Sequence, residues 1–400
     1  MKRWFALLLF CLIFATACQG PQKTPPSSTS SSSFGTSPQS PSSKSLPGAS
    51  NSSTPAEKPS GVLPEFNEDN TITKLWEGPV EHAFFHPLII APEKAFDGSY
   101  RERGFDDWMV TQDEMKKIFA HLYKRDFVLV KPSEVFKKIN GRWQRNPNLR
   151  MPKGKKPIII SIDDLSYNEV YQGHGFSDKL VLDSAGKVTA EYTEEGVKKQ
   201  ARDHEIATYI NQFVEDHPDF SWKGARGMLA LTGYEGILGY RTQEDAPNRS
   251  AQIEAVKPVI QALRNDGWEF SSHSFSHDSI NHLSMKKLYK DSSMWQEEVE
   301  SLLGPTPFYT LPYGNMPEDD ALKKKTDLLN EFGFHVIFAV GFESYIEPNP
   351  SHPNFIVQDR RAIDGLSMRT QGKLDDLFPV EDVFSPHRKE HPVGEDNSVK

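Results

Sequence analysis

Cysteine is nearly absent from this 400-residue chain. Its two cysteines, Cys11 and Cys18, both lie within the first 18 residues, so the rest of the sequence has no thiol. No disulfide can therefore form in that remainder, whatever the redox state of its compartment. Packing of the core has to stabilise the fold, and the chain is long enough for one large domain.

The sequence also lacks any long run of lysine and arginine. Its formal net charge is −9, and its pI is about 5.8. Proteins that follow a phosphate backbone need clustered positive charge to displace the counterions of the nucleic acid. Nucleic acid is therefore not the expected partner.

Long apolar segments are missing except at the beginning of the chain. Residues 1–18 (MKRWFALLLFCLIFATAC) consist of two cations, an apolar run too short to span a bilayer comfortably, and small residues before Cys18. This pattern predicts an export signal, and its end resembles the lipobox of bacterial lipoproteins, in which the cysteine is lipidated. We therefore expect an extracytoplasmic protein anchored to the bacterial cell membrane by a lipid on Cys18. Cleavage of an ordinary signal peptide nearby is the alternative.

Composition divides the remaining chain into three parts. Residues 19–75 are rich in Ser and Pro and have too few apolar side chains to offset the chain entropy, which predicts a disordered linker. Residues 76–380 are expected to form the functional domain, which we expect to be monomeric. Residues 381–400 are expected to form a polar C-terminal tail.

Short apolar runs alternate with segments of helical spacing throughout the domain. A capping box at Thr111–Glu114 begins one of these helices, and Ile206 to Val214 shows the apolar face of another. Serial alternation predicts an α/β fold with right-handed crossovers, either a closed (β/α) barrel or an open doubly wound sheet. We favour a distorted barrel of seven or eight strands. The predicted strands cover residues 84–90, 127–130, 157–162, 227–231, 268–271, 308–311 and 335–340.

Two adjacent carboxylates, Asp163 and Asp164, follow the continuous apolar run 157–162. Such a run is typical of a strand buried on both faces, and in α/β barrels the functional groups gather at the carboxyl ends of strands. Neighbouring side chains on an extended segment point to different sides, so one carboxylate can bind a metal while the other handles a proton. Taken alone, an Asp–Asp pair at a strand end is more often a turn or a helix cap.

A histidine pair follows a later strand, which makes the carboxylate pair more informative. His273 and His277 are four residues apart, and this spacing places both imidazoles on one face if the segment is helical. Two imidazoles and one carboxylate would leave coordination positions open, a set that suits zinc or another divalent first-row metal such as cobalt, nickel or manganese. Taken alone, a His-x-x-x-His pair is more often a surface or core feature.

A third segment, Pro312-Tyr313-Gly314, also follows a predicted strand and on its own would be a plain turn. The order Asp-Asp, His-Ser-x-x-His and Pro-Tyr-Gly resembles the polysaccharide deacetylase family, also called the NodB-homology domain or carbohydrate esterase family four, over about residues 80–365. The resemblance implies metal-dependent hydrolysis of N-acetyl groups on a chitin-like or peptidoglycan-like polysaccharide. By the same resemblance, Asp163 is the general base that acts on metal-activated water, and Asp164, His273 and His277 are the metal ligands. Pro312, Tyr313 and Gly314 are then expected to contact the substrate.

The sequence departs from the family pattern at two functional positions. Thr310 stands where the family usually has an arginine that pairs with the base, and Arg241, Arg360 and Arg361 are the candidates to replace it. The histidine that usually serves as general acid has no counterpart on the last strand, and the nearest downstream histidines are His352 and His387. These losses keep an alternative open, a glycan-binding lipoprotein that retains the metal cleft without catalysis. A lipid-anchored solute-binding protein would also explain export, but it would not explain the Asp–Asp and histidine pairs.

Two further segments are expected near the mouth of the barrel. Residues 231–236 (LTGYEG) continue from a strand end and are a candidate for substrate contact, although a glycine-rich turn is the favoured interpretation. The polar excursion at residues 167–196 is expected to cap or narrow the cleft.

Overall fold

The computed structural model describes residues 71–317, 319–347, 355–370 and 372–388. The predicted signal, Cys18, His352 and most of the predicted linker lie outside these ranges, so their predicted roles stay predictions. Within the described ranges, no helix combines the length and the apolar character that crossing a bilayer requires.

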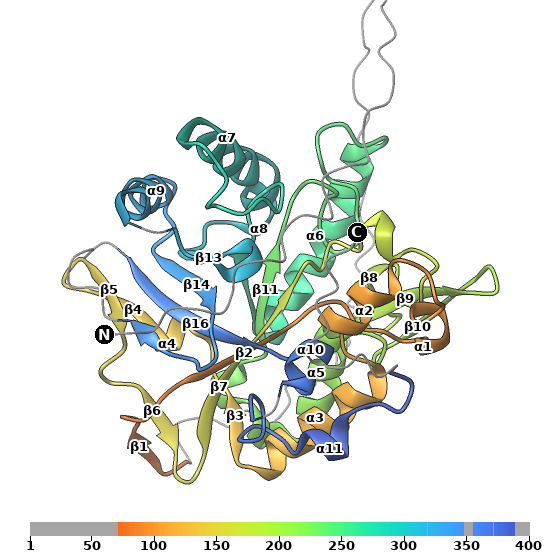
Figure 1. Cartoon of the computed structure of the whole chain (residues 1–400), viewed down its shortest axis with the longest axis horizontal. Helices are drawn as coiled ribbons and strands as arrows, with labels where there is room; N and C mark the ends of the chain where they lie inside the picture. Colours follow the sequence, from red (N-terminus) through yellow and green to blue (C-terminus); the bar gives the residue numbers. More distant parts are fainter. Residues whose placement is uncertain (1–70, 318, 348–354, 371, 389–400) are drawn as a thin grey trace, which may run out of the picture. The chain divides into compact units, whose positions relative to one another are not determined.

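Seven parallel strands close into a barrel, as the alternation of the sequence predicts (Figure 1). β7 pairs with both β2 and β11, and this double pairing closes the ring. β3 (Phe127–Leu129) pairs with residues 156–158 of β7, whereas β11 pairs with residues 161–163 of the same strand. β7 therefore changes its neighbour along its length, and this change distorts the barrel. In order around the ring, the strands are β2 (Glu81–Phe85), β7 (Lys156–Asp163), β11 (Gly227–Leu231), β12 (Trp268–Ser272), β13 (Phe308–Thr310), β14 (Val336–Val340) and β16 (Ile356–Ala362).

The two faces of the barrel strands have different surroundings. On β7, Ile158, Ile160 and Ile162 belong to the large core that the strands share with the outer helices. Ile159 belongs to a second core with residues of other barrel strands, such as Met228 and Phe338. Because side chains alternate along a strand, Asp163 points to the same side as Ile159, into the barrel. The strand register therefore places the first carboxylate inside the mouth.

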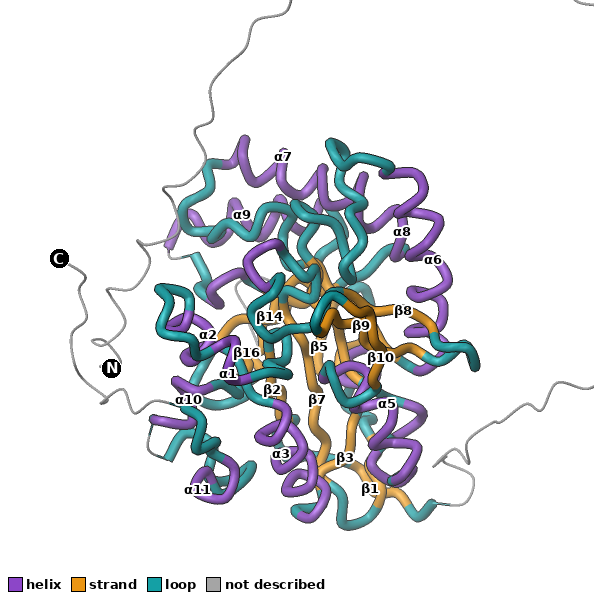
Figure 2. Tube along the Cα trace, turned by 90° about the vertical axis from the view of Figure 1, so that its right-hand side faces the viewer, coloured by secondary structure: helices purple, strands orange, loops and turns teal. Residues whose placement is uncertain are grey.

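The helices lie outside the strands and connect them (Figure 2). α3 begins at the predicted capping box: the Thr111 hydroxyl accepts a hydrogen bond from the Glu114 amide, and the Glu114 carboxylate accepts one from the Thr111 amide. Gly267 ends α6 in the left-handed conformation that favours glycine. The helices are α1 (Pro92–Ala95), α2 (Glu102–Trp108), α3 (Gln112–Lys124), α4 (Pro132–Val135), α5 (Ile206–Asp216), α6 (Arg249–Asp266), α7 (Met285–Trp295), α8 (Ser301–Leu303), α9 (Asp319–Glu331), α10 (Gly365–Arg369) and α11 (Val380–Val383).

Short antiparallel elements decorate the barrel. The predicted polar excursion contains a three-stranded sheet of β8 (Lys179–Leu182), β9 (Val188–Glu194) and β10 (Val197–Ala201). β4 (Phe136–Ile139) and β5 (Arg142–Arg145) form a hairpin, and β15 (Ile346–Glu347) pairs with β16. β1 (Thr73–Leu75) pairs with β6 (Arg150–Pro152), so the predicted linker ends before residue 73 rather than at residue 75.

The predicted polar tail is wrong over residues 381–388. α11 covers the first of these residues, and the side chain of Arg388 is fully buried. Its guanidinium pairs with Asp106 at 2.9 Å and with Glu114 at 2.6 Å. The polar composition of this segment suggested a solvated tail. The charge of Arg388 is instead neutralised by two carboxylates from elsewhere in the chain, so the side chain can be buried.

The first predicted strand is also misplaced. β2 covers Glu81–Phe85 rather than residues 84–90. Pro87 has no amide hydrogen for the ladder, which disfavours a strand that runs through it. His86 is thus the first residue after the strand, at the same end of the barrel as Asp163.

Candidate active site

Asp163 is the last residue of β7, and its side chain is buried in the barrel mouth. Arg360, on β16, donates two hydrogen bonds to this carboxylate, at 2.8 Å to Oδ1 and 2.9 Å to Oδ2. Burial alone would raise the pKa of Asp163, but the charge of Arg360, with His273 and these hydrogen bonds, outweighs burial and lowers the pKa to about 2. The arginine absent at position 310 is therefore replaced from a different strand.

The other two candidate arginines have different partners. Arg241 donates to the backbone carbonyls of Ser166, Tyr167 and Glu235. Arg361 points away from Arg360 on the same strand and pairs with Asp376 and Glu81. Only Arg360 among the three candidates contacts Asp163.

A chain of hydrogen bonds supports Arg360 from inside the barrel. Arg360 donates to the Ser161 hydroxyl at 3.1 Å, and that hydroxyl lies 3.0 Å from Nε2 of His82. Nδ1 of His82 lies 3.0 Å from Oε1 of Gln358, whose amide nitrogen donates to the Val80 carbonyl. Burial, together with the Arg360 charge, lowers the pKa of His82 to about 3, so this imidazole is neutral and can accept from Ser161.

His273 follows β12 and is buried. Its Nδ1 lies 3.0 Å from the Thr310 carbonyl, and because a carbonyl can only accept, Nδ1 carries the hydrogen. This leaves the lone pair on Nε2, which lies 3.9 Å from Asp164. Burial lowers the pKa of His273, which favours the neutral form that binds metals. Thr310 thus orients His273, a candidate metal ligand, through its backbone carbonyl.

His277 completes the cluster, although not through a helix. Residues 273–277 form no helical turn; Ser274 and His277 adopt left-handed backbone conformations, with φ of 57° and 58°. The predicted proximity is nevertheless found, with ring centroids 4.9 Å apart and His277 Nε2 at 3.4 Å from Asp164. Buried Asp291, on α7, holds the segment by accepting hydrogen bonds from the amides of Phe275 and Ser276.

These three side chains fit a metal ion. One ligand atom each from Asp164, His273 and His277 lies within 4.8 Å of the others. Oδ1 of Asp164 is buried and has no hydrogen-bond partner among the described residues, as expected of an atom whose partner is a cation. Asp164 also has a left-handed backbone, with φ of 59°. Non-glycine residues in this region are uncommon and cluster at functional sites.

The Pro-Tyr-Gly turn contributes one exposed side chain to this mouth. Tyr313 is 54 % exposed, and its ring centroid lies 4.9 Å from that of His277. Pro312 and Gly314 are buried. A Cβ at Gly314, where φ is 69°, would lie 2.3 Å or less from side-chain atoms of Val340. Gly314 therefore shapes the turn that presents Tyr313.

His86 is a site residue that the sequence analysis missed. Its Nδ1 lies 2.9 Å from the Trp108 carbonyl, and because a carbonyl can only accept, Nδ1 carries a hydrogen. Nε2 is then the nitrogen that can give or take a proton. Its ring is close enough to lower the pKa of Asp163. The sequence held only a partial signal: Pro87 disfavours a strand that runs through it, but the structure was needed to show that β2 ends at Phe85 and that His86 follows it at the mouth.

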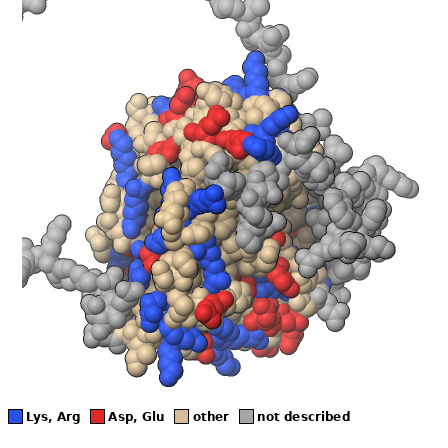
Figure 3. Space-filling model, turned by 90° about the vertical axis from the view of Figure 1, so that its left-hand side faces the viewer, with Lys and Arg blue, Asp and Glu red and all other residues tan. Residues whose placement is uncertain are grey.

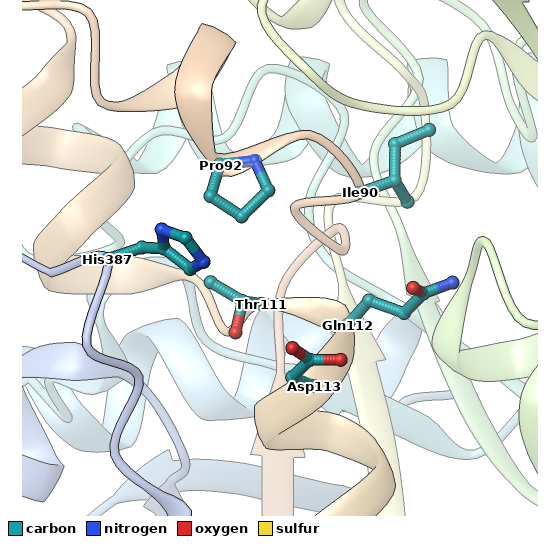
Figure 4. Close-up of a pocket in the computed structure, with 6 residues that line it drawn as sticks. All are labelled: Ile90, Pro92, Thr111, Gln112, Asp113 and His387. Atoms are coloured by element: carbon teal, nitrogen blue, oxygen red, sulfur yellow. The ribbon is translucent and has the colours of Figure 1, made fainter.

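His387, one of the two downstream histidines considered for the acid, lies elsewhere. It lines a pocket of about 210 Å³ with residues that begin α3 or follow β2 (Figure 4). None of them belongs to the candidate metal cluster of Asp164, His273 and His277. The other residues that line the pocket are Ile90, Pro92, Thr111, Gln112 and Asp113.

A polar aromatic wall adjoins Asp164. The Tyr234 amide donates to the Phe275 carbonyl at 3.1 Å, which places Tyr234 beside the segment that carries His277. Burial and then the charge of Asp164 raise the pKa values of Tyr171 and Tyr234. Asn168 donates a hydrogen bond to the Tyr234 hydroxyl, while its own Oδ1 is buried and has no partner among the described residues. The wall comes from the predicted excursion and from segment 231–236, so residues of both lie at the mouth.

One family model matches a part of the chain that contributes to this site. The polysaccharide deacetylase family model matches residues 244–337, a range that includes His273, His277 and the Pro-Tyr-Gly turn. No curated protein matches the chain.

Solved structures with weak similarity include three deacetylases. The Streptococcus pyogenes deacetylase PplD, in complex with acetate, is 12% identical and covers 76% of this chain and 99% of its own, with a TM-score of 0.42. A putative polysaccharide deacetylase from Mycobacterium smegmatis is 15% identical over 38% of this chain and 43% of its own, with a TM-score of 0.26. The chitin deacetylase of Colletotrichum lindemuthianum is 13% identical over 44% of this chain and 73% of its own, with a TM-score of 0.24.

The match of the polysaccharide deacetylase family model to residues 244–337 supports the resemblance predicted from the sequence and a hydrolase of this kind.

Proposed function

We propose that the protein is a metal-dependent deacetylase that hydrolyses N-acetyl groups on a cell-envelope or extracellular polysaccharide, chitin-like or peptidoglycan-like. The observation that carries this proposal is the approach of Asp164, His273 and His277 to within 4.8 Å, next to the Asp163–Arg360 ion pair. One group of side chains can thus hold a cation, and a carboxylate outside that group can handle a proton.

Zinc, or another divalent first-row metal, would be held by Asp164, His273 and His277. When bound, such an ion supplies Lewis acidity toward the acetyl carbonyl and lowers the pKa of water at the site. The chain provides what surrounds that chemistry: the Thr310 carbonyl fixes the ring of His273, and Asp291 fixes the segment that carries His277.

Asp163 is assigned the role of general base. Its low pKa keeps the carboxylate ionised, and therefore able to accept a proton, throughout the neutral range. Arg360 holds both carboxylate oxygens and thereby fixes the orientation of the group. A positioned base typically contributes ~10²–10⁴ in rate.

His86 is assigned the role of general acid. The departing amine needs a proton, and histidine is the side chain that most often supplies one in enzymes. With Nδ1 bonded to the Trp108 carbonyl, a protonated ring would carry its second hydrogen on Nε2, and the pairing of Phe85 with Ile162 places His86 at the same end of the barrel as Asp163. This assignment supplies the step for which the last strand offers no histidine.

The rim of the mouth suits a sugar ring. Trp108 and Leu366 are 46 % and 41 % exposed, and they lie on α2 and α10, two helices tied together by the ion pair between Arg369 and Asp107. Tyr313 lies beside His277. Sugar rings have apolar C–H faces that pack on such surfaces, while Asn168 and Tyr234 offer hydrogen-bonding groups near Asp164.

Acetate release from acetylated chitooligosaccharides and from peptidoglycan tests the proposal, with full-length protein, chelation and metal add-back. Release that vanishes on chelation and returns with metal is the expected result. A bound metal without release from any of these glycans would favour the alternative of a glycan-binding lipoprotein.

We also propose that the enzyme is tethered outside the cytoplasm by a lipid on Cys18. The support is the sequence of residues 1–18, and the Ser/Pro-rich segment that follows would give the tether length. Wild-type protein should partition into the detergent phase, and the Cys18→Ser variant should not. Equal partitioning of the two proteins into the aqueous phase would refute the anchor.

A further inference from the structure

A second cleft lies at the opposite end of the barrel from the metal cluster. It has a volume of about 490 Å³, within the range typical of small-molecule sites. Residues that precede β13 and β14 contribute to it, at the N-terminal ends of strands whose carboxyl ends form the catalytic mouth. The residues that line it are Lys138, Trp143, Gln296, Glu300, Pro305, Thr306, Pro307, Glu331, Phe332, Gly333 and His335.

Aromatic rings form much of the cleft and continue beyond it. Trp143, on hairpin β4–β5, stacks on His335 with centroids 5.9 Å apart and ring planes 20° apart. Phe332 packs edge to face against Tyr289 at 5.3 Å, and Tyr289 is 57 % exposed on α7. The molecule therefore carries a strip of aromatic rings that extends from the hairpin to α7.

A hydrogen-bond donor in this cleft is unused. The indole nitrogen of Trp143 is buried and has no hydrogen-bond partner among the described residues. An indole N–H can only donate, and a buried donor without a partner is costly. A bound hydroxyl or carbonyl oxygen would remove that cost if the Trp143 ring turned to expose its nitrogen to the cleft.

The helix that borders the cleft departs from α-helical geometry at this place. Gln296–Glu300 form a π-helical turn between α7 and α8, and its first and last residues both line the cleft. Such turns are rare and frequently occur at functional sites. The turn positions Gln296 to donate to the Phe332 carbonyl at 3.0 Å, so the polar wall is anchored to the aromatic one.

The polar groups of the cleft indicate a hydroxyl-rich ligand. One lysine, two glutamates, a glutamine and a threonine supply donors and acceptors without a strong net charge. Figure 3 shows the side of the molecule that lies on the left in Figure 1, where the hairpin is drawn, and basic and acidic side chains are interspersed over it. A phosphate would need a cluster of cations. A purely apolar partner would leave these polar groups unpaired.

We propose that this cleft is a second glycan-binding site, in which Trp143 stacks on a sugar and donates to one of its oxygens. It would hold one stretch of the polymer, or a neighbouring strand, while the mouth at the opposite end acts on another. The proposal rests on the proposed function only in taking a glycan as the substrate. Two sites on one chain raise the local substrate concentration without any new contact in the mouth.

Retention of full-length protein on insoluble chitin and on peptidoglycan sacculi tests this site in the wild type, Trp143→Ala and Trp143→Phe. Tyr100→Ala is the matched control, because Tyr100 is a 77 % exposed aromatic residue outside the cleft. Trp143→Ala should weaken retention about tenfold and lower acetate release from the polymers severalfold. Trp143→Phe keeps a ring but loses the donor and should give a smaller loss. Release from diacetylchitobiose, which is too short to reach both sites, should not change.

Tyr289→Ala gives a second test if Trp143→Ala does not fold, because the exposed ring can be removed without opening the core. Retention of Trp143→Phe and Tyr289→Ala equal to that of Tyr100→Ala would overturn the second site, as would absence of wild-type retention on both polymers. Retention that depends on Trp143 without any acetate release would overturn the proposed function and leave the second site standing.

Discussion

Arg360, on β16, binds both carboxylate oxygens of Asp163, on β7, although β2 lies between these two strands in the barrel. The contact crosses the interior of the barrel and joins residues 197 positions apart in the sequence. It provides the ion pair that Thr310 cannot make. It also removes one of the two reasons to regard the protein as an inactive relative.

Arg360→Lys should lower kcat by about tenfold or more, because lysine keeps the charge but cannot form the two-pronged contact that orients the carboxylate. The acid limb of the pH–rate profile should also move to higher pH, since Arg360 contributes to the low pKa of Asp163. Arg361→Lys, at the adjacent residue that points out of the barrel, is the control. Wild-type kcat and an unchanged profile in Arg360→Lys would refute this role.

Substitutions of the two adjacent aspartates should have different effects on turnover and on metal content. Asp163→Asn should abolish turnover and retain the metal, because Asp163 lies outside the ligand group, whereas Asp164→Asn should lose both. Acetate release and elemental analysis of the purified proteins measure the two properties. Loss of metal in Asp163→Asn, or appreciable turnover by that variant, would contradict the assignment.

His86→Gln should lower kcat by ~10²-fold or more, with metal content unchanged, because proton delivery to the amine is lost. Steady-state kinetics on an acetylated chitooligosaccharide give the measurement. His387→Gln, in the separate pocket of Figure 4, provides the comparison and should behave as the wild type. If His86→Gln kept full kcat, the acid would have to come from another group.

His82 should make the fold sensitive to acid. Its pKa is about 3 in the folded protein and 6.5 in the unfolded chain, so neutral His82 stabilises the fold above pH 6.5, and this stability is lost as the pH falls toward 3. Between pH 6.5 and 5, the wild type should lose about 2 kcal/mol of unfolding free energy relative to His82→Gln. Urea unfolding at several pH values measures the difference, with His282→Gln, at an exposed histidine, as the control. Parallel pH profiles of wild type and His82→Gln would show that His82 does not titrate in this way.

Arg388→Met should destabilise the domain by about 3–5 kcal/mol, because it leaves the buried carboxylate of Glu114 without the cation that pairs with it. Lys323→Met removes a cation from an exposed ion pair with Asp327 and should cost about 1 kcal/mol or less. Thermal and urea unfolding compare the two variants. A small effect of Arg388→Met would mean that residues 381–388 do not stabilise the domain, as the polar composition first suggested.

Local patterns in the sequence predicted most of the strands and helices. The apolar run 157–162 corresponds to β7, residues 227–231 are β11, and the capping box begins α3. These predictions succeeded because a strand buried on both faces and a capped amphipathic helix each have a signature within a few residues. β16 was not predicted as a strand, because its sequence VQDRR has three charged residues and no apolar run. The two arginines are tolerated there because each pairs with a carboxylate from another part of the chain.

The site residues also divide into those that the local sequence predicted and those that only the structure shows. The sequence by itself was enough to predict that Asp164, His273 and His277 come together, since they follow strands whose carboxyl ends must meet in any parallel barrel. The tertiary structure decided that Arg360, rather than Arg241 or Arg361, pairs with Asp163, and that His86 lies at the mouth. Those choices depend on how the ring closes and on where β2 ends. A single segment of the sequence cannot show either feature, because the partners come from strands far apart in the chain.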